Sequence, residues 1–266
     1  MPEGPEVKII VSWLNKNIKN KILSDIHILN GRYKRHDNPI NWDKLKHILP
    51  IKIKSVNCKG KFIWFEFYNT ELTIWNTLGM SGWWNYNNYK HNNILFIINN
   101  KNIYFNDVRN FGIIKICNIS NLKKKLNLLG PDILNNNNNF LEFQKRLFRK
   151  RDNTLIANAL LDQKVISGIG NYLRSDILWY SKISPFRKIK NLLINEIKLI
   201  YKNSKKLGQR ALQKHSNQFN KDDILHPSLG QNVFYVYSKN IDKYNNKIIR
   251  KKINNRSIFY VPKIQK

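Results

Sequence analysis

The chain begins MPEGPEVKII, and three of these residues carry groups that could take part in catalysis. If the initiator methionine is removed, Pro2 has a free secondary amine, which becomes a nucleophile when it is deprotonated. An α-amino group titrates near pH ~8, so part of it is deprotonated at neutral pH. Glu3 and Glu6 add carboxylates that could transfer protons or hold a water. The same residues also suit an ordinary helix start, because proline fits the first turn and carboxylates complement the helix dipole.

A second segment suited to binding chemistry is SGIGN at residues 167–171, which lies between two runs of helical period. Gly168 and Gly170 allow the backbone to come close to a ligand. Asn171 would open a helix whose first N–H groups favour an anion. With Lys164 nearby, the segment predicts a phosphate-binding turn, although an ordinary helix–turn–helix corner would have the same spacing.

The charge of the chain indicates a polyanionic partner. Lys and Arg number 47 against 17 Asp and Glu, which gives a net charge of +30 and a pI of about 10.1. The chain up to Asp132 holds 20 basic and 9 acidic residues, and the remainder holds 27 and 8. A surplus in both parts predicts a nucleic acid gripped between them. A low-GC genome that fills surfaces with Lys and Asn is the alternative, as the NNNNN run at 135–139 hints.

Composition excludes several other classes of protein. With 42% hydrophobic residues the chain can bury a core, and no apolar run reaches the ~18 residues of a membrane span. Acidic residues stand where a signal peptide would have its basic region. Cys58 and Cys117 are too few for a disulfide scaffold or a cysteine zinc site. We therefore expect an intracellular, metal-free protein. We also expect it to act as a monomer without a cofactor, although composition does not show this.

The pattern of apolar residues predicts an α+β fold. Residues 4–17 have helical spacing, and seven short strand-like runs between residues 21 and 118 are typical of an antiparallel sandwich or barrel. The period is helical from residue 140 to about residue 212. Beyond residue 232 it is strand-like again, in VFYVYS, KIIRKKI and SIFYVP.

SGIGNYLRSDILW resembles the helix–two-turn–helix signature of the Fpg/Nei family of DNA glycosylases. PEGPE matches the opening of that family, and LGMSG (78–82) and NDVRNFG (106–112) lie where its other motifs do. RSIFYVPKIQK resembles its C-terminal hairpin. Motifs in the family's order over nearly the whole chain are more specific than any one of them, and PEGPE favours the Nei-like branch over the Fpg-like one.

The resemblance assigns roles to the catalytic candidates. It implies that Pro2 attacks C1′ of a damaged nucleotide and forms an iminium, which allows strand cleavage by β,δ-elimination. Glu3 would transfer protons, Glu6 would hold the amine or a water, and Lys61 would contact the phosphate beside the damaged nucleotide. Lys61 could instead be a solvated edge-strand lysine, and Lys59 could replace it if the register slips by two residues.

An enzyme that acts on a base within duplex DNA must extrude the base and fill the hole. The resemblance makes Met80 the plug, with Arg109 facing the orphaned base and Phe111 wedging the stack. Met80 and Phe111 could instead be core residues. Asn110 departs from a second arginine that often precedes this phenylalanine, which leaves one phosphate contact open.

The C-terminal hairpin departs from many relatives, which carry four cysteines as a zinc finger. This chain lacks them and resembles the zincless finger of eukaryotic and viral Nei-like enzymes and plant Fpg-like enzymes. Arg256 falls where the family's finger arginine grips phosphates. Near the four cysteine positions stand Tyr244, Lys247, Val261 and Ile264. The DNA-binding residues implied by the resemblance are Lys164, Gly168, Gly170, Asn171 and Arg256.

We therefore predict a bifunctional glycosylase and abasic-site lyase of base-excision repair, which removes oxidised pyrimidines and ring-opened purines from double-stranded DNA. Residues 1–132 would form a catalytic β-sandwich domain, 133–139 an Asn-rich linker, 140–230 a helix–two-turn–helix DNA-binding domain and 231–266 a zincless finger hairpin. Residues 215–230 occupy the region that covers the flipped base in relatives. The alternatives are a non-catalytic sensor of damaged or abasic DNA with the same clamp and, more remotely, a basic RNA-binding structural protein.

Overall fold

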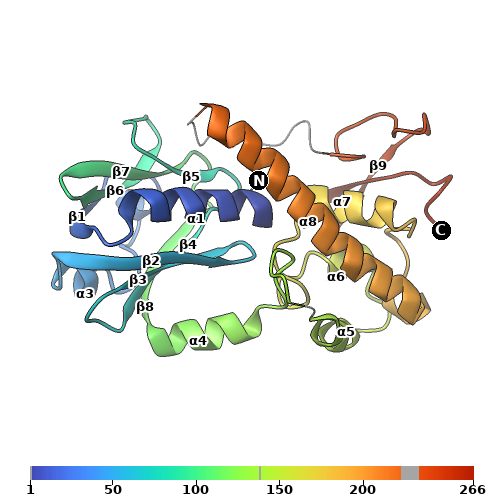
Figure 1. Cartoon of the computed structure of the whole chain (residues 1–266), viewed down its shortest axis with the longest axis horizontal. Coiled ribbons are helices and arrows are strands. Elements are labelled where there is room, and N and C mark those ends of the chain that lie inside the picture. Colours follow the sequence, from blue (N-terminus) through green and yellow to red (C-terminus); the bar gives the residue numbers. More distant parts are fainter. Residues whose placement is uncertain (1, 138, 223–233) are drawn as a thin grey trace. The chain divides into compact units, whose positions relative to one another are not determined.

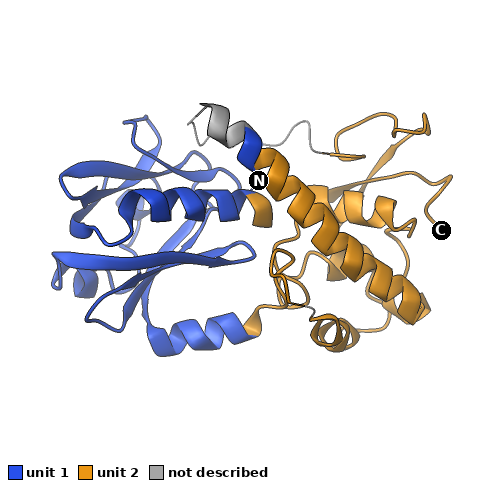
Figure 2. Ribbon diagram, viewed as in Figure 1, with its two compact units in different colours: residues 1–2, 6–127, 216–229 blue, residues 3–5, 128–215, 230–266 orange. Residues whose placement is uncertain are grey.

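The computed structural model describes residues 2–137, 139–222 and 234–266, and the predicted α+β class is confirmed. Contacts divide the chain into two compact units (Figure 2). Unit 1 is built mainly from residues 6–127, and unit 2 mainly from residues 128–215 and the C-terminal part of the chain. Residues 3–5 belong to unit 2. The first methionine, residue 138 of the predicted linker and residues 223–230 of the segment predicted to cover the flipped base lie outside the described residues.

Unit 1 contains an antiparallel sheet with strand order β5-β7-β6-β1-β2-β3-β4-β8. Its halves are joined where Leu23 pairs with Ile51, and Figure 1 shows them as two layers. The ring of Phe65 in one layer lies 5.4 Å from that of Trp84 and 5.9 Å from that of Phe96 in the other, so the core lies between the layers. The strands are β1 (Ile22–Ile28), β2 (Ile51–Lys59), β3 (Phe62–Phe67), β4 (Leu72–Thr77), β5 (Gly82–Asn85), β6 (Asn92–Ile98), β7 (Lys101–Asp107) and β8 (Ile113–Asn118).

Helix α1 (Gly4–Ile18) forms as its apolar spacing predicts, and Val7, Ile10 and Leu14 are buried. Asn15 fixes the helix along β2. Its side-chain nitrogen donates to the carbonyl of Val56 at 2.6 Å, and its oxygen accepts the N–H of Val56 at 2.9 Å. Burial of the apolar face and this paired hydrogen bond together hold α1 against the sheet.

Several short elements of unit 1 have weak sequence signals. Strand β5 is only four residues long and follows directly on the LGMSG motif. In helix α4 (Ile119–Leu128) a run of three lysines interrupts the apolar pattern, and Leu122 is its buried residue. The remaining helices of this unit are α2 (Arg32–Arg35) and α3 (Trp42–Lys46).

Unit 2 packs its helices around Phe143, Leu147 and Ile177 and ends in a β-hairpin. Asn254 and Asn255 turn the hairpin with φ of 48° and 61°, which a two-residue hairpin turn requires and asparagine tolerates. Among the described residues, no helix is long and apolar enough to cross a membrane. The elements are α5 (Phe140–Phe148), α6 (Ile156–Ala159), α7 (Asn171–Tyr180), η1 (Ile189–Asn191), α8 (Ile194–Asp222), β9 (Ile249–Ile253) and β10 (Arg256–Tyr260).

The prediction of a strand in VFYVYS is wrong, because the described residues of this segment form bends and turns. The buried carboxylate of Asp176 in α7 accepts the N–H of Tyr235 at 2.8 Å, of Val236 at 2.9 Å and of Tyr237 at 3.3 Å. Three consecutive N–H groups therefore point to one side chain and are not available to a sheet. The alternating aromatic pattern of the segment gives no sign of this distant acceptor.

Further side chains of α7 bind the C-terminal segment. Arg174 donates to the carbonyl of Ser257 at 2.9 Å, and Ser175 Oγ accepts the N–H of Phe259 at 3.3 Å. Trp179 donates its ring N–H to Asp242 at 3.1 Å. The hairpin is thus held to α7 by a polar clasp, which we define as the contacts of Arg174, Ser175, Asp176 and Trp179 with residues 235–259.

Asp176→Asn should destabilise unit 2, because asparagine has one acceptor oxygen where the carboxylate uses two. We expect a loss of about 2 kcal/mol. Burial raises the pKa of Asp176 to about 6, although the N–H groups of residues 235–237 act to lower it. The folded carboxyl therefore binds its proton more readily than the unfolded one, and the wild type gains stability from this group as the pH falls from about 7 to about 4.

Because asparagine does not titrate, the stability difference between the two proteins should grow on acidification. Urea unfolding of both proteins at about pH 7 and about pH 4.5 measures it. A difference that shrinks at the lower pH would contradict the raised pKa.

Candidate active site

Glu3 is buried and anchored on the first turn of α7. Its carboxylate accepts the backbone N–H of Gly170 at 2.5 Å, of Tyr172 at 2.9 Å and of Leu173 at 3.3 Å. These groups have no partner within the helix, and the helix dipole favours a negative charge at this end. The site therefore stabilises Glu3 as an ionised carboxylate, held in one place by a helix that begins far along the chain.

The helix start thus differs from the phosphate-binding turn that the sequence suggested. The N–H groups expected to meet a phosphate bind the side chain of Glu3 instead. Gly168 and Gly170 serve the same docking. The N–H of Gly4 donates to the carbonyl of Gly168 at 2.8 Å, and a Cβ at Gly170 would lie 2.3 Å from the Glu3 carboxyl carbon. DNA binding by these two glycines stays a prediction.

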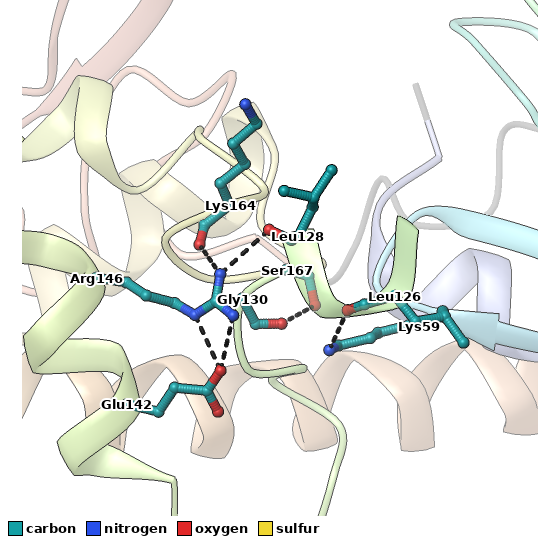
Figure 3. Close-up of polar contacts among 8 residues, drawn as sticks. All are labelled: Lys59, Leu126, Leu128, Gly130, Glu142, Arg146, Lys164 and Ser167. Carbon is teal, nitrogen blue, oxygen red and sulfur yellow. Dashed lines mark hydrogen bonds and ion pairs between the residues drawn. The ribbon is translucent and has the colours of Figure 1, made fainter. Parts of the chain in front are cut away.

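The turn itself is held by polar contacts, of which Figure 3 shows those of Arg146. Gln163 accepts the N–H of Gly168 at 2.9 Å and donates to the carbonyl of Ile169 at 3.0 Å. Arg146, paired with Glu142 at 2.9 Å, donates to the carbonyl of Lys164 at 3.0 Å. Sequence reasoning missed both Gln163 and Arg146. Gln163 lies within the DQK part of the motif, whereas nothing in the sequence around Arg146 marks it.

Two predicted DNA contacts lie at this turn. Asn171 is the first residue of α7 and is partly exposed. Lys164 is exposed, and Figure 3 shows its side chain extending away from Arg146. Its backbone carbonyl binds Arg146, so the residue has a fixed backbone and an amine in solvent.

Within unit 1, Pro2 and Glu6 are buried. Lys61 lies in the turn between β2 and β3 and is partly buried. The amine of Lys59 donates to the carbonyl of Leu126 at 2.9 Å (Figure 3), at the last turn of α4. The amine of Lys59 thus binds the backbone of α4, and the phosphate contact by Lys61 stays a prediction.

The three residues predicted to fill the vacated base position are on the surface of unit 1. Met80 is 40% exposed and Phe111 is 54% exposed, so neither is a core residue. Arg109 is also exposed, and its guanidinium lies 5.2 Å from the centre of the Phe111 ring. Large apolar side chains left in water at loop tips are typical of a binding surface.

Hydrogen bonds pin the two loops that carry these residues. Ser81 Oγ donates to Asp107 at 2.5 Å and accepts the N–H of Arg109 at 2.9 Å. Asp107 also accepts the N–H of Gly112 at 2.6 Å. Asn110 departs from the family's arginine and has φ of 57°, a conformation that asparagine tolerates. Loops 78–82 and 107–112 thus form one braced tip.

Arg256 is exposed at the start of β10, and a buried arginine supports it. Arg174 binds the carbonyl of the next residue in the hairpin, as described above. Burial lowers the pKa of Arg174 to about 10; the charge of Glu3 acts to raise it and that of Arg256 to lower it. Arg174 therefore stays charged at neutral pH and is electrostatically coupled to both. Its only sequence signal is an arginine inside an otherwise largely apolar stretch, YLRSDILWY.

The hairpin does not suit the zinc site of cysteine-bearing relatives. The residues near those positions offer a phenol, an amine and two aliphatic side chains, none of which holds zinc as thiolates and imidazoles do. Within the described part of the chain, no group of three or more His, Cys, Asp or Glu residues could hold a metal ion. The contacts that hold the hairpin to α7 are those of the polar clasp.

Comparison with known proteins decides the family. Residues 1–114 match the formamidopyrimidine-DNA glycosylase N-terminal domain, and residues 129–221 match the formamidopyrimidine-DNA glycosylase H2TH domain. The chain belongs to the formamidopyrimidine-DNA glycosylase family. The resemblance seen in the sequence is therefore confirmed, while its assignment to a zincless branch stays a prediction.

Curated relatives that match most of this chain carry the same family name. The formamidopyrimidine-DNA glycosylase of Wolbachia sp. subsp. Drosophila simulans is 31% identical over 258 residues, covering 90% of this chain and 89% of the relative. That of Mycoplasma genitalium is 30% identical over 284 residues, covering 100% and 96%.

Solved structures share the fold. A complex of LlFpg with THF-DNA and an inhibitor has a TM-score of 0.87 at 22% identity, with 100% of both chains covered. A complex of Lactococcus lactis Fpg with DNA containing an oxidised pyrimidine has a TM-score of 0.85 at 22% identity and covers 100% of both chains.

Gly170→Ala should displace the Glu3 carboxylate. The φ of Gly170 is −126°, which alanine adopts without strain, so the effect comes from the collision of the new Cβ with Glu3. We expect a loss of about 2 kcal/mol in the free energy of unfolding as hydrogen bonds to the helix start are broken.

A double-mutant cycle with Glu3→Ala tests this cause. In the Glu3→Ala background, Gly170→Ala should cost under about 0.5 kcal/mol, because the group it collides with is gone. Denaturant unfolding of the four proteins gives the comparison. Equal costs in both backgrounds would show that Gly170 acts independently of Glu3.

Proposed function

We propose that the chain is a base-excision-repair DNA glycosylase that also cleaves the strand at abasic sites. The observation that carries the proposal is the side chain of Glu3, which accepts three N–H groups at the start of α7 and is joined by one peptide bond to Pro2. Family membership supports the glycosylase activity. DNA containing an oxidised pyrimidine or an abasic site in complexes of Lactococcus lactis Fpg supports the substrate class.

In the first step, the Pro2 nitrogen bonds to C1′ as the bond between C1′ and the base breaks. The base leaves with the electron pair and takes up a proton from the solvent. The C1′–O4′ bond then opens, the nitrogen lone pair forms the iminium, and the proton lost by nitrogen passes through Glu3 to O4′. An ionised Glu3 suits this role, because it must accept a proton before it can deliver one.

In the second step, the iminium acts as an electron sink. Its nitrogen carries no remaining N–H, since proline is a secondary amine, so it stays cationic. The 2′ proton is acidified, and its loss expels the 3′ phosphate by β-elimination. A δ-elimination then releases the 5′ phosphate. Lys61 would bind a phosphate beside the damaged nucleotide, and Glu6 would hold the amine or a water.

The remaining predicted residues would hold the DNA. Met80, Arg109 and Phe111 would occupy the place of the extruded base, and their exposure on a braced tip supports this role. Asn171, Lys164 and Arg256 would contact phosphates, supported by a net charge of +30. In this proposal residues 1–132 form the catalytic domain, 133–139 a linker, 140–230 the DNA-binding domain and 231–266 a finger without zinc.

Borohydride reduction in the presence of abasic-site duplex tests the proposal. The wild type should form a covalent adduct in which mass spectrometry places the DNA on Pro2. The same chain with its initiator methionine retained should form none, because the proline nitrogen is then an amide. Tight binding of the duplex by the wild type without any adduct would support a damage sensor instead.

Glu3→Gln should separate the two activities. We expect base excision from a duplex with one oxidised pyrimidine to fall by at least about 100-fold, since the proton relay is lost. Cleavage at a preformed abasic site should keep a larger share of its rate, because no base has to be removed there. Single-turnover gel assays give both rates, and equal losses would count against the proton role of Glu3.

A further inference from the structure

Unit 2 carries a cluster of aromatic rings and cations that the proposed mechanism does not use. We call it the aromatic–cation cluster. It joins the C-terminal end of α7, the middle of α8 and the segment that leads into the hairpin. Its members are Trp179, Tyr180, Lys206, Arg210, Tyr235, Lys243 and Tyr244.

The rings of the cluster are in contact with one another. Trp179 stacks on Tyr235 with centroids 5.2 Å apart and an interplanar angle of 23°. Tyr180 lies 5.9 Å from Tyr235, and Tyr244 lies 6.2 Å from Trp179 at 32°. Trp179 is buried, whereas Tyr244 is 63% exposed and Tyr180 and Tyr235 are partly exposed. Aromatic surface therefore reaches solvent above a buried indole.

Cations lie over the rings. The guanidinium of Arg210 is 4.3 Å from the centre of the Tyr235 ring, and the amine of Lys243 is 4.7 Å from that of Tyr244. The amine of Lys206 donates to the Tyr180 hydroxyl at 2.9 Å, and this bond lowers the pKa of Tyr180. These contacts hold positive charge at the edges and faces of the rings.

The carboxylate nearest in sequence does not cancel this charge at the surface. Asp242 is buried, and it accepts the ring N–H of Trp179 and the backbone N–H of Tyr244 at 2.9 Å. It therefore orients the rings from beneath. The exposed residues of the cluster are Tyr244, Lys206 and Lys243, whose phenol and amines together attract an anion with aromatic groups.

The cluster is separate from the Glu3 site. Asn171 begins α7 and Tyr180 ends it, and a ten-residue helix is about 15 Å long. Packing accounts for Trp179, which forms a small core with Val236 and Phe259. It does not account for Tyr244, because most of that side chain lies in water.

We propose that the aromatic–cation cluster binds single-stranded DNA. Unpaired bases expose faces that stack on tyrosine, and the phosphates between them match the cations of the cluster. Duplex DNA hides its base faces, so its phosphates would contact the cations of the cluster but its bases would not stack on the rings. The inference rests on the proposed function only in placing the chain on DNA, where opened or cleaved duplex supplies such strands.

Fluorescence anisotropy with a labelled oligothymidylate of about 12 nucleotides tests the proposal. Tyr244→Ala should weaken binding by about tenfold, within the range measured for loss of one stacked base. Lys243→Ala should weaken binding. It should also reduce the slope of the logarithm of the binding constant against the logarithm of the salt concentration by about one. Tyr68→Ala is the matched control, because Tyr68 is an exposed tyrosine of unit 1 with Lys52 at 5.5 Å from its ring and lies outside the cluster.

Photocrosslinking of a strand that contains 5-iododeoxyuridine, read by mass spectrometry, should map to Tyr244 or Tyr180. Equal affinity of wild type and Tyr244→Ala, or crosslinks found only elsewhere in the chain, would overturn the proposal. Cleavage of abasic-site duplex by Tyr244→Ala should equal that of the wild type. If neither protein cleaves, the proposed function fails while the strand-binding result stands by itself.

Discussion

The contact on which the site depends is the carboxylate of Glu3 on the first N–H groups of α7. A helix start has donors that nothing in the helix can satisfy, and burying them without a partner costs about 1–3 kcal/mol each. The third residue of the chain meets that need from a great distance in sequence, and Gly170 has no Cβ to obstruct it. Since one peptide bond joins Pro2 to Glu3, this contact also limits where Pro2 can lie.

The sequence predicted what depends on local pattern. The spacing of apolar residues placed α1 and most strands, and the glycines of SGIGN marked a close approach of backbone. What approaches is the chain's own N-terminus, and no local pattern could show that. The error at VFYVYS has the same origin. Alternating aromatic residues favour a strand, but the N–H groups that a strand would need donate to the carboxylate of Asp176 instead.

Arg174 and Asp176 show why charged side chains inside α7 carry structural meaning. A buried charge is costly unless it is bonded, and each of these residues is bonded to the C-terminal segment. Removing the bonded groups of the C-terminal segment would leave a buried charge in α7 without compensation for its desolvation. The hairpin is therefore tied to the helix by directional contacts that tolerate little displacement, which is what a metal site provides in cysteine-bearing fingers.

Three consequences follow from one ten-residue helix. Its first turn holds Glu3, its middle holds the hairpin that presents Arg256, and its last residues support the aromatic–cation cluster. A rigid helix keeps these groups at fixed separations, because its backbone hydrogen bonds allow little change in rise. Substitutions that shift α7 should therefore displace Glu3 and Arg256 together, whereas substitutions at Tyr244 should leave both in place. The three groups differ in chemistry but depend on the same helix. Only a substitution of a group's own side chains can therefore change one of them without changing the others.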